Sequence, residues 1–214
     1  MTITWRRKPL LYGAVVLTLA GRAAASAITY DVTVNTSSIT GTLGSLDLNF
    51  NPGPLSTQTA FLEILGFSGD GTLSGGPALT GDVSGSLPAT LTFDNETAFN
   101  DYFEGFTFGS TLSFQVSLYG PALSSPDGTS MSGSTFAFSM FSDPAGTMPT
   151  LTSDTTDGFA FTVDVNLDGT TTVSNFSSQT SVVPAGTSTP EPGSAALLGT
   201  GLVCVVALRL RRRT

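Results

Sequence analysis

The sequence contains no histidine, and its eight lysines and arginines lie only at the two ends, before residue 23 or after residue 208. All sixteen Asp and Glu residues fall between Asp31 and Glu191, so the middle of the chain is purely anionic. A domain without Lys or Arg lacks the charge that neutralises phosphates, which argues against nucleic-acid binding and against a phosphate-binding loop. The absence of an imidazole excludes Ser-His-Asp and Cys-His catalysis.

Cysteine and tryptophan are almost absent as well. Cys204 lies in an apolar run near the C-terminus and Trp5 lies near the N-terminus, so the middle of the chain contains neither residue type. A disulfide framework and zinc sites of the His/Cys type are therefore excluded there. Because side-chain salt bridges are also impossible in this region, we expect its stability to come from apolar burial, backbone hydrogen bonds and bound cations.

The N-terminal residues have the pattern of a secretory signal peptide. Three basic residues at 6–8 precede an apolar segment at 10–20, and Ala25-Ser26-Ala27 is a small-x-small cleavage site. The sequence predicts a signal peptide over residues 1–27, with cleavage after Ala27 and with Ala25 as a second candidate. The alternative is an N-terminal membrane anchor that is never cut.

The C-terminal residues have the pattern of a membrane anchor. Residues 195–208 are uncharged and mostly apolar, and a helix of this length spans about 21 Å, against about 30 Å for a bilayer core. The positive-inside rule predicts that the basic cluster after this helix stays cytoplasmic and the body lies on the opposite side. This cluster stops translocation and consists of Arg209, Arg211, Arg212 and Arg213.

Pro190, Glu191 and Pro192 directly precede that apolar segment. The order of Pro-Glu-Pro, short hydrophobic helix and arginine cluster over residues 190–214 resembles a PEP-CTERM sorting signal. The resemblance implies an exosortase-type processing enzyme as partner, a membrane-anchored intermediate, removal of the tail and delivery to the cell surface of a bacterium that makes extracellular polysaccharide. The alternative is a plain C-terminal anchor on a proline-rich stalk.

Residues 28–183 have the length of one domain and alternate apolar with polar residues. Such period-two runs, separated by Gly, Pro, Asp and Ser, predict half-buried antiparallel strands. The fold class expected is all-β, an antiparallel β-sandwich or jelly roll. The alternating residues include Leu46, Leu48 and Phe50; Leu87, Ala89, Leu91 and Phe93; Leu112, Phe114, Val116 and Leu118; and Phe159, Phe161, Val163 and Val165.

Residues 94–106 depart from this alternation. Ala98, Phe99, Tyr102 and Phe103 have helical spacing, which predicts one short helix with its acidic residues on a solvated face. Residues 184–189 are expected to be a linker to the sorting signal. The run from Asn100 to Phe103, followed by Phe-Gly-Ser at 108–110, is similar to small domains of unknown function carried by other PEP-CTERM proteins.

Asp164, Asn166 and Asp168, followed by Gly169, match the first half of a calcium-binding loop. In such loops oxygen atoms at alternate positions converge on a hard cation, so these three residues are candidate calcium ligands. The twelfth position, where the loop requires Glu, is Asn175. The alternative is a β-hairpin with Asp168-Gly169 as a type I′ turn, and the two interpretations can coexist.

The expected function is that of an exported protein of the cell surface or extracellular matrix, with a structural, adhesive or polysaccharide-interaction role. One alternative is a calcium-dependent glycan-binding module. Another is a carboxylate-based glycoside hydrolase, which requires two acidic side chains about 5 to 10 Å apart. We expect that the protein is not an enzyme.

Overall fold

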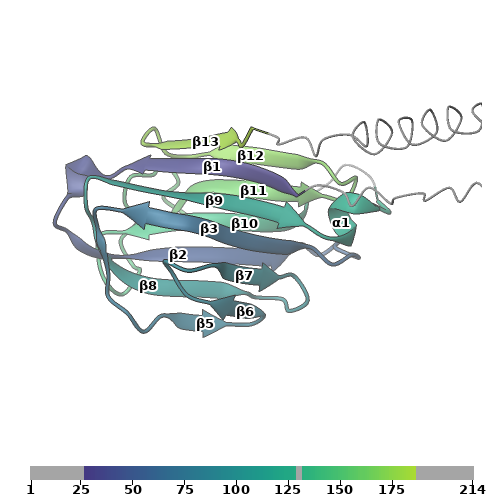
Figure 1. Ribbon diagram of the computed structural model, residues 1–214, viewed down its shortest axis with the longest axis horizontal. Helices are drawn as coiled ribbons and strands as arrows, with labels where there is room; N and C mark the ends of the chain where they lie inside the picture. The colour runs from purple at the N-terminus through teal and green to yellow at the C-terminus, as the bar shows by residue number, and fades with distance from the viewer. Residues whose placement is uncertain (1–26, 129–131, 187–214) are drawn as a thin grey trace, which may run out of the picture.

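A computed structural model describes residues 27–128 and 132–186, which form two antiparallel β-sheets packed face to face (Figure 1). The predicted β-sandwich is therefore confirmed. Sheet A contains, in spatial order, β13 (Thr180–Pro184), β1 (Ile28–Asn35), β9 (Thr111–Tyr119), β3 (Phe61–Gly69), β7 (Leu91–Asp94) and β6 (Val83–Gly85). Sheet B contains β12 (Thr171–Asn175), β11 (Phe159–Asn166), β10 (Ser132–Phe141), β2 (Leu43–Pro52), β8 (Asp101–Thr107) and β4 (Thr72–Leu73), and β5 (Ala78–Thr80) also pairs with β8.

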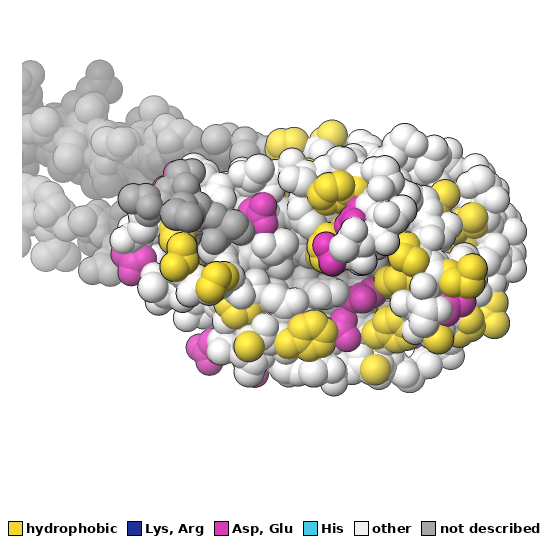
Figure 2. Space-filling view, turned by 180° about the vertical axis from the view of Figure 1, so that it is seen from behind, with side chains coloured by type: hydrophobic (Ala, Val, Ile, Leu, Met, Phe, Trp, Pro, Cys, Tyr) yellow, Lys and Arg dark blue, Asp and Glu magenta, His cyan; other side chains and the backbone are white. Residues whose placement is uncertain are grey.

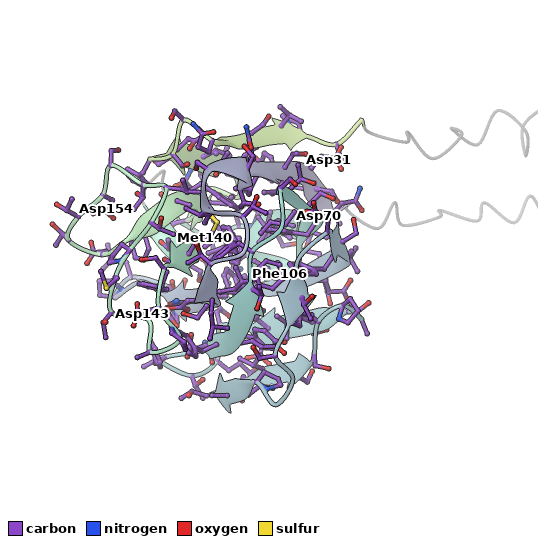
Figure 3. All side chains as sticks on the ribbon, turned by 90° about the vertical axis from the view of Figure 1, so that its left-hand side faces the viewer. Asp31, Asp70, Phe106, Met140, Asp143 and Asp154 are labelled. Carbon is purple, nitrogen blue, oxygen red and sulfur yellow. The ribbon has the colours of Figure 1, made fainter. Side chains whose placement is uncertain are left out.

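The core lies between the sheets and consists of the alternate residues of each strand. In Figure 3, Met140 and Phe106 lie between the sheets, whereas Asp143 and Asp154 lie on the outer side of sheet B. Phe114 of sheet A contacts Phe138 of sheet B with ring centroids 5.2 Å apart. Each fully buried side chain of this kind contributes about 1.5–3 kcal/mol of transfer free energy, which is how a domain without ion pairs is stabilised.

The predicted helix over residues 94–106 is wrong. Its second half, residues 101–106, belongs to strand β8, which pairs with β2, whereas Asp94 ends β7 and residues 95–98 are bends. The inner face of β8 carries Tyr102, Glu104 and Phe106, all buried. The strand is hard to predict from the sequence because its buried face includes the acidic Glu104, a residue type that is usually exposed. The short helix of the structure is instead α1 (Pro121–Ser124), and residues Ser37–Ile39 form a 3-10 turn.

The sandwich also extends slightly into the predicted linker. Strand β13 runs to Pro184, which pairs with Tyr30, and the backbone N–H of Ala185 donates to Thr29 at 2.8 Å. No helix within residues 27–128 and 132–186 is long and apolar enough to span a membrane. The predicted signal peptide up to Ser26, with its candidate Ala25, and the predicted helix at 195–208 lie outside the described residues.

Candidate functional site

Figure 2 shows the side of the molecule opposite to that of Figure 1, where the surface is hollowed in its middle, with acidic side chains near the hollow and hydrophobic side chains around it. Strand β2 buries Leu46, Leu48 and Phe50 against the core, so its alternate residues Asp47 and Asn49 lie on the outer face. The register of sheet B fixes their neighbours: Asn49 pairs with Asp101, and Asp47 pairs with Phe103. We call this region the outer-face hollow, defined by Asp47, Asn49, Asn51, Asp101 and Phe103.

Side-chain amides and a carboxylate form a hydrogen-bonded row along β2. Asn51 Nδ2 donates to Asn49 Oδ1 at 3.3 Å, and Asn49 Nδ2 donates to Asp47 Oδ1 at 2.6 Å. At the opposite end, the backbone N–H of Asn100 donates to Asn51 Oδ1 at 2.6 Å. A side-chain amide carries two N–H donors, and each amide uses one of its donors within this row. The row therefore orients polar groups on an open sheet face without consuming all of their hydrogen-bonding capacity.

At the end of the row, the carboxyl groups of Asp47 and Asp101 are hydrogen-bonded to each other. Burial, followed by the hydrogen bond to Asp47, raises the pKa of Asp101 to about 8. Burial also raises the pKa of Asp47, and its hydrogen bonds with Asp101 and Asn49 oppose that shift. Oδ1 of Asp101 is buried and has no hydrogen-bond donor among the described residues. Two carboxyl groups can form a hydrogen bond only if one of them carries a proton.

One side of the outer-face hollow is covered by the loop that follows β10. A Cβ atom on Gly146 would lie only 2.7 Å from Cε2 of Phe103, and Gly146 has a φ of 70°, so glycine is required for this close packing. Ser45 Oγ donates to the carbonyl of Asp143 in the same loop at 3.0 Å. The loop is thereby held against the outer face of sheet B.

The carboxylate of Asp143 keeps this loop in shape. It accepts hydrogen bonds from the backbone N–H groups of Thr147 at 2.9 Å and Met148 at 2.7 Å, and from Thr147 Oγ1 at 2.9 Å. Although desolvation opposes the shift, these hydrogen bonds hold the pKa of Asp143 below its usual value. Asp143 therefore carries a negative charge within the loop that covers the outer face of sheet B.

An exposed aromatic side chain lies close in the chain to the other end of the amide row. Phe99 is 53% exposed, and it directly precedes Asn100, whose backbone N–H binds Asn51. Phe103 of the outer-face hollow is partly buried. Amide, carboxyl and aromatic groups thus occur together on and beside one open face.

The three candidate calcium ligands lie on the hairpin between β11 and β12, and the hairpin interpretation is correct. Asp164 Oδ1 accepts from Thr135 Oγ1 at 2.6 Å, Asn166 Nδ2 donates to Thr170 and Thr172 at 3.0 Å, and Asp168 Oδ1 accepts from Thr170 Oγ1 at 2.6 Å. Threonines of the sheet and of the turn are therefore partners of all three side chains.

The expected type I′ turn is wrong. A type I′ turn needs a positive φ at both central residues, and only Gly169, with a φ of 81°, has one here. The N–H of Gly169 donates to the carbonyl of Asn166 at 3.0 Å, and the N–H of Asn166 donates to the carbonyl of Thr170 at 2.8 Å. The hairpin instead has a tight turn followed by a left-handed glycine.

No group of three or more His, Cys, Asp or Glu residues in the described parts of the chain is arranged to hold a metal ion. Calcium binding by Asp164, Asn166 and Asp168 stays a prediction. The carboxyl pair of the outer-face hollow also differs from the geometry of a glycoside hydrolase. Asp47 and Asp101 are in hydrogen-bond contact, whereas hydrolases hold their two carboxyl groups about 5 to 10 Å apart.

The proximity of Asp47 and Asp101 was not predicted from the sequence. The alternation of Leu46, Leu48 and Phe50 already placed Asp47 and Asn49 together on an outer face. The partner was missed because Asp101 had been assigned to a helix, where it would not pair with β2. The period-two spacing of Asn100, Tyr102 and Glu104 predicts strand β8, and with it the position of Asp101, if polar residues are allowed on the buried face.

Residues 188–213 match the PEP-CTERM protein-sorting motif. The match includes the predicted sorting residues Pro190, Glu191 and Pro192 and the arginine cluster at 209–213, all of which lie outside the described residues. The motif implies that this is an exported protein sorted and processed by an exosortase at the membrane before its release. Comparison with curated proteins and with solved structures finds no match.

Proposed function

We propose that the exported domain is a polysaccharide-interacting protein of the bacterial cell surface or extracellular matrix, and that the outer-face hollow is its binding surface. The hydrogen-bonded row of Asn51, Asn49 and Asp47 on an open sheet face is the observation that supports this proposal. Sugar hydroxyl groups both donate and accept hydrogen bonds, so they complement a surface of amide and carboxyl groups.

The charge of the domain favours an uncharged glycan. The sequence has no Lys or Arg between residues 23 and 208, so an anionic polysaccharide meets like charge across the whole domain. A neutral polysaccharide meets no such repulsion. The exposed aromatic ring of Phe99 provides an apolar face against which the C–H groups of a sugar ring can pack.

Retention of the exported protein in gels that contain a polysaccharide tests this proposal. Cellulose oligomers, curdlan and dextran serve as neutral glycans, and alginate serves as the anionic glycan. We expect retention by at least one neutral glycan and none by alginate in the absence of divalent cations. Retention by none of the three neutral glycans, or by alginate alone, would contradict the proposal.

Matched variants on the two outer faces identify the binding surface. Asn49→Ala removes an amide from the outer-face hollow, and we expect retention to fall about 5- to 10-fold, the effect of one hydrogen bond of about 1–1.5 kcal/mol. Gln115→Ala removes an amide from the outer face of sheet A, where Gln115 Nε2 donates to Asp31 at 2.8 Å. Equal losses in the two variants would show that the outer-face hollow is not the site.

The membrane steps before release are a second part of the proposal. We propose cleavage after Ala27, a transmembrane intermediate held by residues 195–208, and removal of the arginine cluster by the exosortase. The intact mass of the protein released from the cell tests all three steps, because it gives both ends of the mature chain. A released protein that retains Arg209 to Arg213 would contradict exosortase processing.

A further inference from the structure

We infer that Asp47 and Asp101 share one proton at neutral pH and form a pH-sensitive anchor of the outer-face hollow, which offers an uncharged glycan a hydrogen-bond donor and an acceptor side by side. The role in glycan binding rests on the proposed function, whereas the shared proton does not. The shared proton and the glycan anchor are both inferred from the positions of the two carboxyl groups on the neighbouring strands β2 and β8.

The arrangement of the two carboxyl groups, on neighbouring positions of the paired strands β2 and β8, favours a counter-charge between them. They are hydrogen-bonded to each other, and Oδ1 of Asp101 is buried with no donor among the described residues. Two ionised carboxylates in contact repel each other strongly. No Lys, Arg or His exists between residues 23 and 208 to neutralise them, so a proton is the counter-charge that the chain itself can hold.

The surroundings of the pair contain few other ionisable groups. Strands β10, β5 and β4, which lie beside β2 and β8, carry none, and Asp47 is the only ionisable residue of β2. Tyr102 and Glu104 of β8 face the core instead. The covering loop after β10 carries three further carboxylates, Asp143, Asp154 and Asp157.

Two of these loop carboxylates are held ionised by backbone N–H groups. Asp143 binds Thr147 and Met148, and Asp154 binds Thr156 at 3.0 Å and Asp157 at 3.2 Å. Backbone hydrogen bonds, the one from Asp157 foremost, lower the pKa of Asp154. Fixed negative charge beside the outer-face hollow favours retention of the proton by the pair.

Stability should depend on pH in a characteristic direction. Because burial and the hydrogen bond to Asp47 raise the pKa of Asp101 from 3.8 to about 8, the folded state binds a proton that the unfolded state has released between these pH values. The contribution of this pair to stability is therefore fully present below about pH 4, falls as the pH rises toward 8, and is level above that. The chain has no His, the side chain whose unperturbed charge change falls in this pH range.

Thermal unfolding of the exported protein between pH 5 and 8.5 tests the shared proton. We expect the Tm to fall by about 5 °C or more, and we expect Asp101→Asn to abolish this slope because its amide donates to Asp47 without titrating. Asp31→Asn is the matched control, because it replaces an aspartate of sheet A in the same way. Its Tm should fall with rising pH as the wild-type Tm does. An equal slope in Asp101→Asn and wild type would overturn the inference.

Two further measurements keep the inference falsifiable if Asp101→Asn does not fold. Carbon-13 NMR of the wild-type carboxyl groups should show one Asp resonance that titrates above pH 6.5, and titration of every Asp below pH 5 would overturn the shared proton. Millimolar calcium, compared with magnesium at pH 8.5, should change the Tm of wild type and of Asp101→Asn by the same amount. A calcium-specific rise that Asp101→Asn removes would show that a metal ion, and not a proton, lies between the carboxyl groups.

Retention on a neutral glycan at pH 5 and at pH 8.5 tests the second part. We expect retention at least about 5-fold weaker at pH 8.5, with no such change in Asp101→Asn. Retention without pH dependence would overturn the anchor while leaving the proposed function intact. A Tm slope with no retention at either pH would instead overturn glycan binding and leave the shared proton standing.

Discussion

Tyr102 donates its phenolic proton to Oε2 of Glu104, two residues further along β8, and both side chains are buried on the inner face of sheet B. The other carboxylate oxygen of Glu104 accepts from the N–H of Gly75 at 2.9 Å, and the N–H of Leu87 donates to the Tyr102 hydroxyl at 3.1 Å. The buried Glu104 is thus bound by two donors, Tyr102 and the N–H of Gly75, and Tyr102 is held in turn by the N–H of Leu87. This network joins the β4–β7 region to the end of the sandwich core.

Removal of the Tyr102 hydroxyl should destabilise the domain. Tyr102→Phe leaves the buried N–H of Leu87 and an oxygen of Glu104 without their partner, which costs about 1–3 kcal/mol. The matched control is Tyr119→Phe, whose hydroxyl donates to Glu63 at 3.1 Å in a partly exposed position, and we expect a cost below about 1 kcal/mol. Urea unfolding measures both values, and equal losses would contradict a special role for the buried network.

The covering loop depends on a glycine at position 146. Gly146→Ala adds a Cβ against the ring of Phe103 at a residue with a φ of 70°, so we expect a loss of about 2–3 kcal/mol. Gly41→Ala has a similar φ of 81° but no atom within 4 Å of the new Cβ. Its cost should be that of the backbone conformation alone, about 1 kcal/mol. Chemical denaturation gives the free energy of unfolding of both variants, and the difference between their losses is the cost of the contact with Phe103.

Acid should destabilise the protein through three loop carboxylates. Backbone hydrogen bonds, first that from Thr111, lower the pKa of Asp70 to about 2, and the pKa values of Asp143 and Asp154 are lowered as well. A carboxyl group whose pKa is lowered by folding stabilises the folded state fully above the ordinary Asp pKa of about 3.9. That stabilisation is lost as the pH falls toward 2. The Tm should therefore decrease below about pH 4, and Asp70→Asn should reduce that decrease.

Calcium binding at the β11–β12 hairpin has an equally direct test. If Asp164, Asn166 and Asp168 hold calcium, millimolar calcium should raise the Tm of the EDTA-treated protein by several degrees, because a ligand that binds only the folded state stabilises it. Asp164→Ala should remove that rise. A rise in Tm no larger than the rise that magnesium produces would mean that the three side chains stabilise the hairpin and do not bind calcium.

The sequence predicted the strands whose buried faces are wholly apolar, such as β2, β9 and β11. It failed at β8, because Asn100 and Glu104 are buried polar residues whose partners are distant in sequence: Asn100 Nδ2 donates to the carbonyl of Phe50 at 2.9 Å, and Glu104 binds Gly75. Local spacing cannot show such tertiary hydrogen bonds. The carboxyl pair of the outer-face hollow was missed for the same reason, since Asp101 reaches Asp47 only through the pairing of β8 with β2.

The most direct test of the proposed function is to map a neutral oligosaccharide onto the protein by NMR chemical-shift changes, using a fragment of whichever polysaccharide retains it. We predict that the largest changes fall on the side-chain amides of Asn49 and Asn51 and on the backbone of residues 99–103, with the sheet A amide of Gln115 unaffected. Changes concentrated on sheet A or at the ends of the sandwich would contradict binding at the outer-face hollow.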